Sequence, residues 1–300
     1  MSTADTIPVL FDTDIGSDID DAVALAYLLR QPRCELLGIT TVSGDTAKRA
    51  ALAEIVSRAG RGRRRLPPIH AGLTGPLLHG PGQPNVPQYE AVAKRPHRRD
   101  YAPSQAIEFL RKTIRARPGQ ITLLAVGPMT NVGALFALDP ELPGLLKRIV
   151  LMCGVFKNPK PDAREWNALV DPVASGLTFK RGAGRLLSVG LDVTTRCKLP
   201  ADECRRRFAR AGGALAVVAE MAEVWFKGAR EITFHDPLAA ALVFAPDLCG
   251  YETGTVQVNT DDTPLAGQTR WQPAGGGPHV IAAEVHPDRF FDHYFAVTGG

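Results

Sequence analysis

The acidic segment between residues 12 and 21 constrains what this chain can fold into more than any other feature. It holds five aspartates within ten residues, namely Asp12, Asp14, Asp18, Asp20 and Asp21. An apolar run precedes the segment and a helical apolar pattern follows it, which predicts a strand, a tight turn and a helix start. Carboxylates this close repel one another unless a cation lies among them, and Ca²⁺ and Mg²⁺ prefer oxygen ligands. The segment therefore predicts a metal site at the end of a strand, where α/β proteins commonly keep their active sites.

A solvated turn and an EF-hand loop are two other interpretations of this segment. Asp20 and Asp21 suit the first turn of a helix, where carboxylates interact favourably with the helix dipole. A helix cap, however, leaves the remaining acids unexplained. An EF-hand loop needs Gly at its sixth position and Glu at its twelfth. Counting from Asp12, these positions hold Ser17 and Val23, so the EF-hand pattern fails.

Apolar runs of strand length alternate with helical patterns through the first two-thirds of the chain. The expected strands span residues 9–12, 36–42, 121–126, 149–153 and 186–191. The expected helices span residues 20–29, 47–58, 104–116, 130–138 and 171–180, then 201–211, 213–226, a helix that opens near Asp236, and 288–297. This alternation is typical of the α/β class and predicts a doubly wound, mainly parallel, Rossmann-like sheet with helices on both faces.

The remaining segments complete a predicted single domain over residues 1–300, because no repeat or linker divides the sequence. Short β-like runs between Gly and Pro turns at 254–281 predict an irregular C-terminal cap. The Pro/Gly-rich stretches 72–87 and 271–278 predict long loops, and the first would overhang the carboxyl edge of the sheet.

Composition excludes few functions but sets useful expectations. Apolar residues make up 45% and charged residues 22%, as in an ordinary globular protein, and the net charge of +4 does not indicate a nucleic-acid partner. No apolar run is long enough for a membrane span, and the first residues do not resemble a signal peptide. The five cysteines are scattered, which predicts reduced thiols in a cytoplasmic protein.

Three later segments place polar side chains at expected strand or helix ends. Val126 ends an expected strand, before a Gly-Pro turn. Glu165 and Asn167 are two apart on an expected extended segment and would point the same way, as contacts to vicinal hydroxyls require. His235 and Asp236 open an apolar helix, and a His beside carboxylates suits a general acid. Taken singly, each segment also fits ordinary turns, a surface loop or a helix cap.

Taken in order, these segments resemble the inosine–uridine-preferring nucleoside hydrolases. That family hydrolyses the N-glycosidic bond of ribonucleosides with a tightly bound Ca²⁺. The resemblance is carried by the acidic turn and by residues 38–45, 68–72, 126–132, 149–152, 165–167, 171–172, 190–194 and 235–236. It implies Ca²⁺-dependent cleavage of a small-molecule ribonucleoside to ribose and free base by a water held on the metal, through an oxocarbenium-like transition state. It also implies a homodimer or homotetramer.

The resemblance also implies roles for individual residues. The Ca²⁺ ligands would be Asp14, Asp21, Asp236 and the main-chain carbonyl of Val126. Asp14 would also act as the general base, and His235 would contact the base and stabilise it as it leaves. The implied substrate contacts are Asp12, Asp20, Asp45, Asn158, Glu165, Asn167 and His235.

The chain departs from the family pattern at three places. Ile15 replaces the usual Pro, and the acidic turn is two residues longer, which makes Asp18 an extra acid. Asp45 stands where the family usually has Asn. Pro159 stands where the family often has another Asn, with Asn158 beside it, so the contact to the ribose 5′-hydroxyl is open.

Two alternatives from other classes stay open at this stage. A phosphatase with an Asp nucleophile also begins its site with Asp-x-Asp, and Asp12 would then be the nucleophile. A binding protein that kept the pocket without turnover is the second, and Asp45 is the substitution that favours it. The base preference is not predicted, although Trp225, Phe226 and His235 are candidates to contact a base.

Overall fold

The computed structural model describes residues 6–62, 65–157, 160 and 162–299. Its strands are β1 (Ile7–Thr13), β2 (Cys34–Thr41), β3 (Ile69–Ala71), β4 (Thr122–Ala125), β5 (Arg148–Leu151), β6 (Leu186–Ser188), β7 (Lys198–Pro200), β8 (Glu231–Thr233), β9 (Cys249–Val258), β10 (Thr269–Pro273) and β11 (His279–Val285). The longer helices are α1 (Asp20–Arg30), α2 (Thr46–Gly60), α4 (Ala106–Ala116), α5 (Thr130–Leu138), α8 (Pro172–Gly182), α10 (Ala201–Ala211), α11 (Ala214–Trp225), α12 (His235–Leu242) and α13 (Pro287–Thr298). The shorter ones are α3 (Tyr89–Val92), α6 (Leu142–Leu145), α7 (Trp166–Val170), α9 (Leu191–Thr194) and the 3₁₀ turn η1 (Pro246–Leu248).

Nine strands form one sheet in the order β10-β9-β11-β6-β5-β4-β1-β2-β3. The neighbours from β3 to β11 pair in parallel, and only the two pairings of β9 are antiparallel. Strands β7 and β8 form a separate antiparallel pair. The predicted mainly parallel α/β sheet is confirmed.

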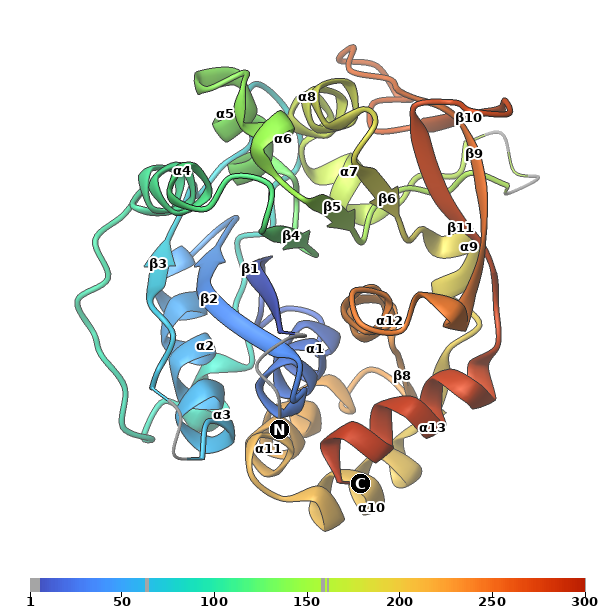
Figure 1. Cartoon of the computed structure of the whole chain (residues 1–300). Helices are drawn as coiled ribbons and strands as arrows, with labels where there is room; N and C mark the ends of the chain where they lie inside the picture. Colours follow the sequence, from blue (N-terminus) through green and yellow to red (C-terminus); the bar gives the residue numbers. More distant parts are fainter. Residues whose placement is uncertain (1–5, 63–64, 158–159, 161, 300) are drawn as a thin grey trace.

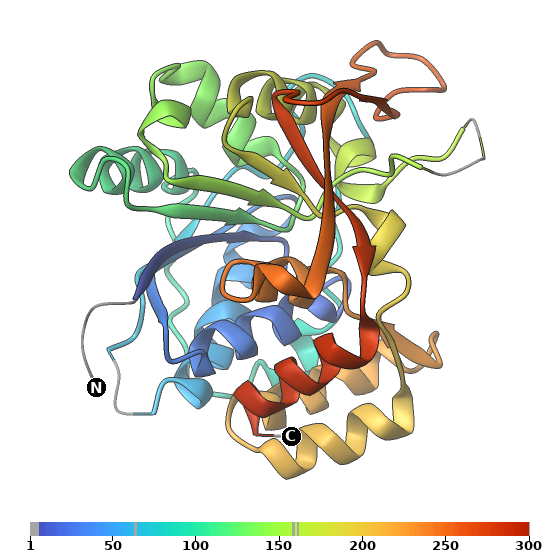
Figure 2. The same cartoon turned by 45° about the vertical axis from the view of Figure 1, so that its right-hand side comes forward.

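Helices cover both faces of this sheet, as predicted. Helices α4, α5, α6 and α8 lie on one face, and α1, α2, α12 and α13 lie on the other, with α10 and α11 outside them (Figures 1 and 2). Strand β1 shows why two layers are needed. Val9 and Phe11 belong to the hydrophobic cluster with α1, whereas Leu10 belongs to the cluster with α5. Because successive side chains of a strand point to opposite faces, a strand that is apolar throughout must be buried on both.

The C-terminal tail differs from the predicted irregular cap. Strand β11 joins the sheet in parallel beside β6, and β9 and β10 continue the sheet outward as antiparallel strands. The stretch 271–278 is not a loop throughout, because its first three residues belong to β10. The loop at 72–87 contains no helix or strand, as predicted. Within the described residues, no helix combines the length and the apolar character that a membrane crossing requires.

The position of β1 in the sheet determines where a site can form. Its neighbours are β2 on one side and β4 on the other. The chain leaves β1 for β2 and β3 in one direction and returns through β4, β5 and β6 in the opposite direction. At such a switch point, the loops after the two central strands diverge and leave a crevice at the carboxyl edge of the sheet.

Candidate active site

The acidic turn follows β1 directly and therefore lies at this switch point. Gly16 adopts a φ of 115°, a conformation that favours glycine, and this lets the turn reverse within a few residues. Ile15 and Ile19 are fully buried and anchor the turn in the hydrophobic cluster around α1. The turn is thus an ordered part of the core, and a solvated turn does not describe it.

Arg49 of α2, which the sequence pattern did not single out, holds the backbone of this turn. Its side chain is fully buried, and its guanidinium donates to the carbonyl oxygens of Asp14 and of Ile15, the latter at 3.1 Å. It also donates at 2.7 Å to the carbonyls of Ser43 and of Gln83. One cation therefore joins the acidic turn, the turn after β2 and the loop at 72–87.

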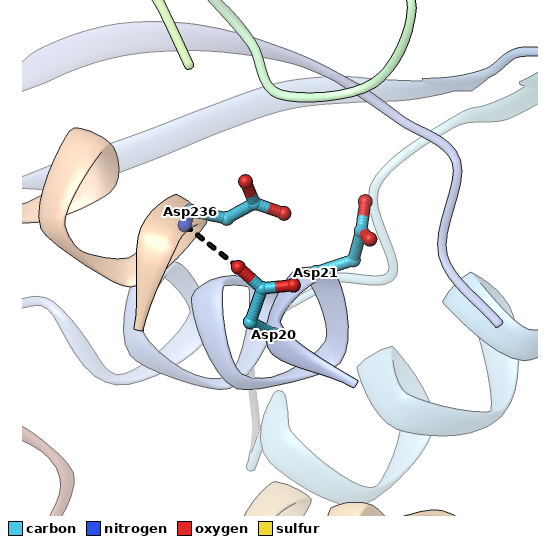
Figure 3. A group of neighbouring side chains, drawn as sticks. All are labelled: Asp20, Asp21 and Asp236. Atoms are coloured by element: carbon cyan, nitrogen blue, oxygen red, sulfur yellow. Dashed lines mark hydrogen bonds between the residues drawn. The ribbon is translucent and has the colours of Figure 1, made fainter. Parts of the chain in front are cut away.

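Three carboxylates converge at the entrance to α1 and α12. Asp20, Asp21 and Asp236 each offer one carboxylate oxygen, and these oxygens all lie within 4.8 Å of one another (Figure 3). The main-chain amide of Asp236 donates to Oδ2 of Asp20 at 2.9 Å, which joins the two helix starts. The amide of Asp14 and the hydroxyl of Thr13 both donate to Oδ1 of Asp21.

This cluster carries an electrostatic cost that a cation would relieve. Burial raises the pKa of Asp20 and of Asp236 well above the usual range; repulsion from Asp18 adds to the shift of Asp20, and repulsion from Asp20 adds to that of Asp236. Burial, with repulsion from Asp14, does the same to Asp21. Buried carboxylates are stable in the ionised form only when paired or bound to metal. The donor set of several oxygens from buried carboxylates therefore fits a hard divalent cation.

A cavity of about 550 Å³ opens above the cluster. Eight residues predicted for the site line it, namely Asp14, Asp20, Asp21, Val126, Glu165, Asn167, His235 and Asp236. They come from the ends of β1 and β4 and from the starts of α1, α7 and α12. A volume in this range suits a small-molecule ligand.

Glu165 and Asn167 reach the cavity in a different way from the prediction. The expected extended segment is wrong, because Glu165 caps α7 and Asn167 lies inside that helix. The Glu165 carboxylate accepts hydrogen bonds from the main-chain amide of Asn167 at 2.7 Å and from the main-chain amide of Gly154 at 3.0 Å. The side-chain amide of Asn167 donates a hydrogen bond to the main-chain carbonyl of Val126 at 2.6 Å. These contacts fix both side chains and join α7 to the end of β4.

His235 is the first residue of α12, and its side chain faces a threonine from another element. Nδ1 of His235 lies 2.7 Å from the hydroxyl of Thr194 in α9. Burial, together with the positive charge of Lys198, lowers the pKa of His235 to about 4. The imidazole is therefore neutral near pH 7, so it acts on a ligand as a hydrogen-bond donor or acceptor rather than as a cation.

Two of the predicted substrate contacts lie outside the cavity. Asp12 is fully buried, and its Oδ1 accepts from the hydroxyl of Thr40 and from the amide group of Asn131. These contacts join the end of β1 to β2 and to the start of α5, and Asp12 does not line the cavity, so neither a ribose contact nor a role as phosphatase nucleophile fits. Asp45 is also absent from the lining and instead caps α2 by accepting from the amide of Lys48 at 2.9 Å. Asn158 lies outside the described residues.

The lengthened part of the turn and the long loop meet at the rim of the cavity. The hydroxyl of Ser17 donates to the carbonyl of Asn85 at 2.7 Å, and both residues line the cavity. Asp18 lines it too, and burial raises its pKa to about 6. The loop at 72–87 therefore reaches the carboxyl edge, as its position in the sequence predicted. Trp166 and Trp225 add aromatic surface to the lining.

Comparisons with known proteins agree with this geometry. Residues 9–292 match the family described as inosine-uridine preferring nucleoside hydrolase. Uridine nucleosidase 1 of Arabidopsis thaliana is 30% identical, with 84% of this chain and 78% of that protein covered. The pyrimidine-specific ribonucleoside hydrolase RihA of Klebsiella pneumoniae subsp. pneumoniae is 31% identical, with 88% of each chain covered. A solved plant nucleoside hydrolase, PpNRh1, superposes with a TM-score of 0.81 at 25% identity, over 98% of this chain and 99% of the other.

The switch-point cavity and these matches together place the protein among the hydrolases that act on N-glycosyl compounds. The chain belongs to the inosine–uridine preferring nucleoside hydrolase family. The resemblance inferred from the ordered segments is thereby confirmed.

Proposed function

We propose that this nucleoside hydrolase cleaves ribonucleosides to ribose and free base in a Ca²⁺-dependent reaction. The observation that carries the proposal is the convergence of the Asp20, Asp21 and Asp236 carboxylates at the base of a ligand-sized cavity. His235 lines the same cavity and supplies a polar group for the leaving base.

Asp14, Asp21, Asp236 and the carbonyl of Val126 are the proposed Ca²⁺ ligands. All four line the cavity. Asp20 is assigned to the ribose, as the family resemblance implies, and one of its carboxylate oxygens lies within 4.8 Å of those of Asp21 and Asp236. When bound, Ca²⁺ would lower the pKa of a water molecule and bind the vicinal hydroxyls of the ribose.

The residues of the chain then act on charge and on protons. Cleavage of the C1′–N bond builds positive charge on the ribose ring, and the surrounding carboxylates stabilise that charge more in an oxocarbenium-like transition state than in the bound substrate. Asp14 takes a proton from the attacking water as the general base. The water attacks the face opposite the base, as in inverting glycosidases. Glu165 and Asn167, fixed at the start of α7, orient the sugar.

Two further predictions accompany this function. The homodimer or homotetramer predicted from the family resemblance stays a prediction that light scattering would test. The cytoplasmic location also stays a prediction.

A panel of ribonucleosides tests the proposed function. We expect free ribose from at least one of uridine, cytidine, inosine, adenosine and guanosine, and pyrimidines come first because two of the relatives are named for them. Asp236→Asn removes a buried carboxylate of the cluster and should lower kcat by at least about 100-fold. Asp45→Asn is the matched control, since Asp45 lies outside the cavity and Asn also caps helices, and it should keep nearly full activity. No ribose from any nucleoside would contradict the proposal.

A further inference from the structure

The imidazole of His235 is hydrogen-bonded to a threonine of a neighbouring helix. Thr194 ends α9 and is fully buried, and its hydroxyl is the partner of Nδ1 of His235 at 2.7 Å. The residue before the histidine, Phe234, donates its amide to the carbonyl of Cys197 at 2.8 Å. Two hydrogen bonds therefore join residues 194–197 to the start of α12, and they fix the orientation of the imidazole.

The direction of the hydrogen bond between Thr194 and His235 follows from what each group can donate. If Nδ1 carried the proton, the Thr194 hydroxyl would accept it, and the hydroxyl proton would need an acceptor of its own. Within the described part of the chain, the Thr194 hydroxyl makes no other hydrogen bond. Buried donors are nearly always paired, so the hydroxyl donates to Nδ1. Nδ1 is then the acceptor, and Nε2 carries the imidazole proton.

The two nitrogens of the imidazole face different surroundings. Nδ1 faces Thr194, which does not line the cavity, whereas the His235 side chain does line it. Nε2 is therefore the nitrogen available to the cavity, and the described residues place no hydrogen-bond partner on it. A donor without a protein partner on a cavity wall is available to an acceptor atom of the ligand.

We propose that Thr194 is a positioning residue, which fixes His235 in the tautomer whose Nε2–H donates a hydrogen bond to the departing base. The proposal rests on the proposed nucleoside hydrolysis. In that reaction the C1′–N bond breaks with both electrons passing to the base, and the oxygen of water bonds to C1′. Water loses one proton and the base gains one, so no further reagent is needed. A donor at Nε2 stabilises the negative charge that develops on the base, whereas the other tautomer would present a lone pair.

Two substrates that differ in their leaving group test this role of Thr194. One is uridine or inosine, whichever the wild-type protein cleaves faster. The other is 4-nitrophenyl β-D-ribofuranoside, whose nitrophenolate leaves without help from a donor. Thr194→Val should lower kcat/KM for the nucleoside by about 10- to 100-fold, a part of what a positioned proton donor contributes. It should change kcat/KM for the nitrophenyl riboside by less than about threefold.

Two control variants separate positioning from folding. Thr194→Ser keeps the hydroxyl and should stay close to wild type on both substrates. His235→Ala should show the same selective loss as Thr194→Val. If Thr194→Val lost activity equally on both substrates, or lost none on the nucleoside, a positioning role would be ruled out.

A measurement without turnover keeps this inference separate from the proposed function. The ¹⁵N chemical shifts of the His235 ring, assigned by comparison with His235→Ala in Ca²⁺-loaded protein, report which nitrogen carries the proton. We expect protonated Nε2 and bare Nδ1 in the wild type and a mixture in Thr194→Val. Protonated Nδ1 with bare Nε2 in the wild type would overturn the inference, even if nucleosides are hydrolysed. Absence of hydrolysis with the expected tautomer would instead count against the proposed function.

Discussion

Gly127, just after β4, lies in direct contact with Asp14 in the turn after β1. A Cβ atom built on Gly127 would lie 2.8 Å from the amide nitrogen of Asp14 and 2.9 Å from its Oδ1. Real side chains do not tolerate such distances to backbone, so only glycine lets the two segments approach this closely. The spacing between the Val126 carbonyl and Asp14, two of the proposed metal ligands, therefore depends on this one residue.

Gly127→Ala should displace the acidic turn and weaken both metal binding and stability. Overpacking of a buried site typically costs about 1–3 kcal/mol, and misplaced ligands should lower Ca²⁺ affinity at least about tenfold. Denaturant unfolding and calorimetric Ca²⁺ titration measure the two effects. Gly144→Ala is the control, because a Cβ there meets nothing within 4 Å. Equal Ca²⁺ affinity in the two variants would contradict the proposed ligand geometry.

The residues of the site differ in how well the sequence predicts them. Asp20, Asp21 and Asp236 could be found because acids next to a strand or at a helix start are local patterns. The role of Asp45 could not be predicted from the sequence, because an Asp before a helix fits both a helix cap and a substrate contact, and only the position of the cavity distinguishes the two. Arg49 gave no signal, because its partners are main-chain carbonyls from distant segments.

At the scale of elements, helix α2 connects two separate segments of the site. Through Arg49 it holds the acidic turn and the loop at 72–87 together, so one helix organises two walls of the cavity. Helix α7 makes a similar connection. Its N-cap residue, Glu165, accepts hydrogen bonds from the main-chain amide of Gly154 and from that of Asn167 in the first turn of α7. These contacts make the rigid parts of the fold responsible for the geometry of the site.

Arg49→Met should destabilise the protein and loosen both segments that Arg49 holds. Loss of a buried, fully hydrogen-bonded cation that faces carboxylates should cost about 3–5 kcal/mol. Hydrogen exchange should rise at residues 14–19 and 83–85. Arg58→Met lies on the same helix and removes a half-exposed guanidinium from Glu54, which still accepts from the hydroxyl of Tyr101, so the loss should be about 1 kcal/mol or less. If the two variants unfolded at the same denaturant concentration, Arg49 would not have the organising role that its contacts indicate.

The elements were predicted well where local patterns decide them. Helices α5 and α10 have the predicted bounds: α10 because its apolar residues follow the helical period, and α5 because a Gly-Pro turn precedes it. Helix α7 was missed because its N-cap is Glu165, and glutamate is not a usual N-cap residue. The β-like runs at 254–281 were predicted, but the place of β9 and β10 in the main sheet was not, because strand pairing depends on distant partners.

At the scale of the whole molecule, the parallel order around β1 explains why one site exists and where it lies. The order β3-β2-β1-β4-β5-β6 brings the loops after β1 and β4 to one crevice. The alternation of apolar runs predicted this class of sheet, but the order of its strands depends on packing between distant segments. The fold thereby brings several carboxylates together. Their mutual repulsion lowers the stability of the folded protein unless a cation binds among them.

The stabilisation that Ca²⁺ gives should therefore increase with pH. Burial raises the pKa of the proposed ligands Asp21 and Asp236 well above the range of about 4 for an unfolded chain, and it raises that of Asp18, which also lines the cavity, to about 6. A folded state with raised carboxyl pKa values binds protons more tightly than the unfolded state, so without metal these groups lower stability as the pH rises above about 4. Calorimetry with and without Ca²⁺ should show a larger difference in Tm at pH 8 than at pH 5.5. A constant difference would contradict an ionised cluster as the metal site.

Release of ribose from the best nucleoside of the panel, before and after removal of metal, tests the central claim most directly. Treatment with a chelator should reduce the rate by at least about 100-fold, and added Ca²⁺ should restore it with one equivalent bound per chain. Asp236→Asn should be neither inhibited further by the chelator nor rescued by Ca²⁺. An unchanged rate of ribose release in the chelated wild-type protein would contradict a Ca²⁺-dependent reaction at the acidic turn.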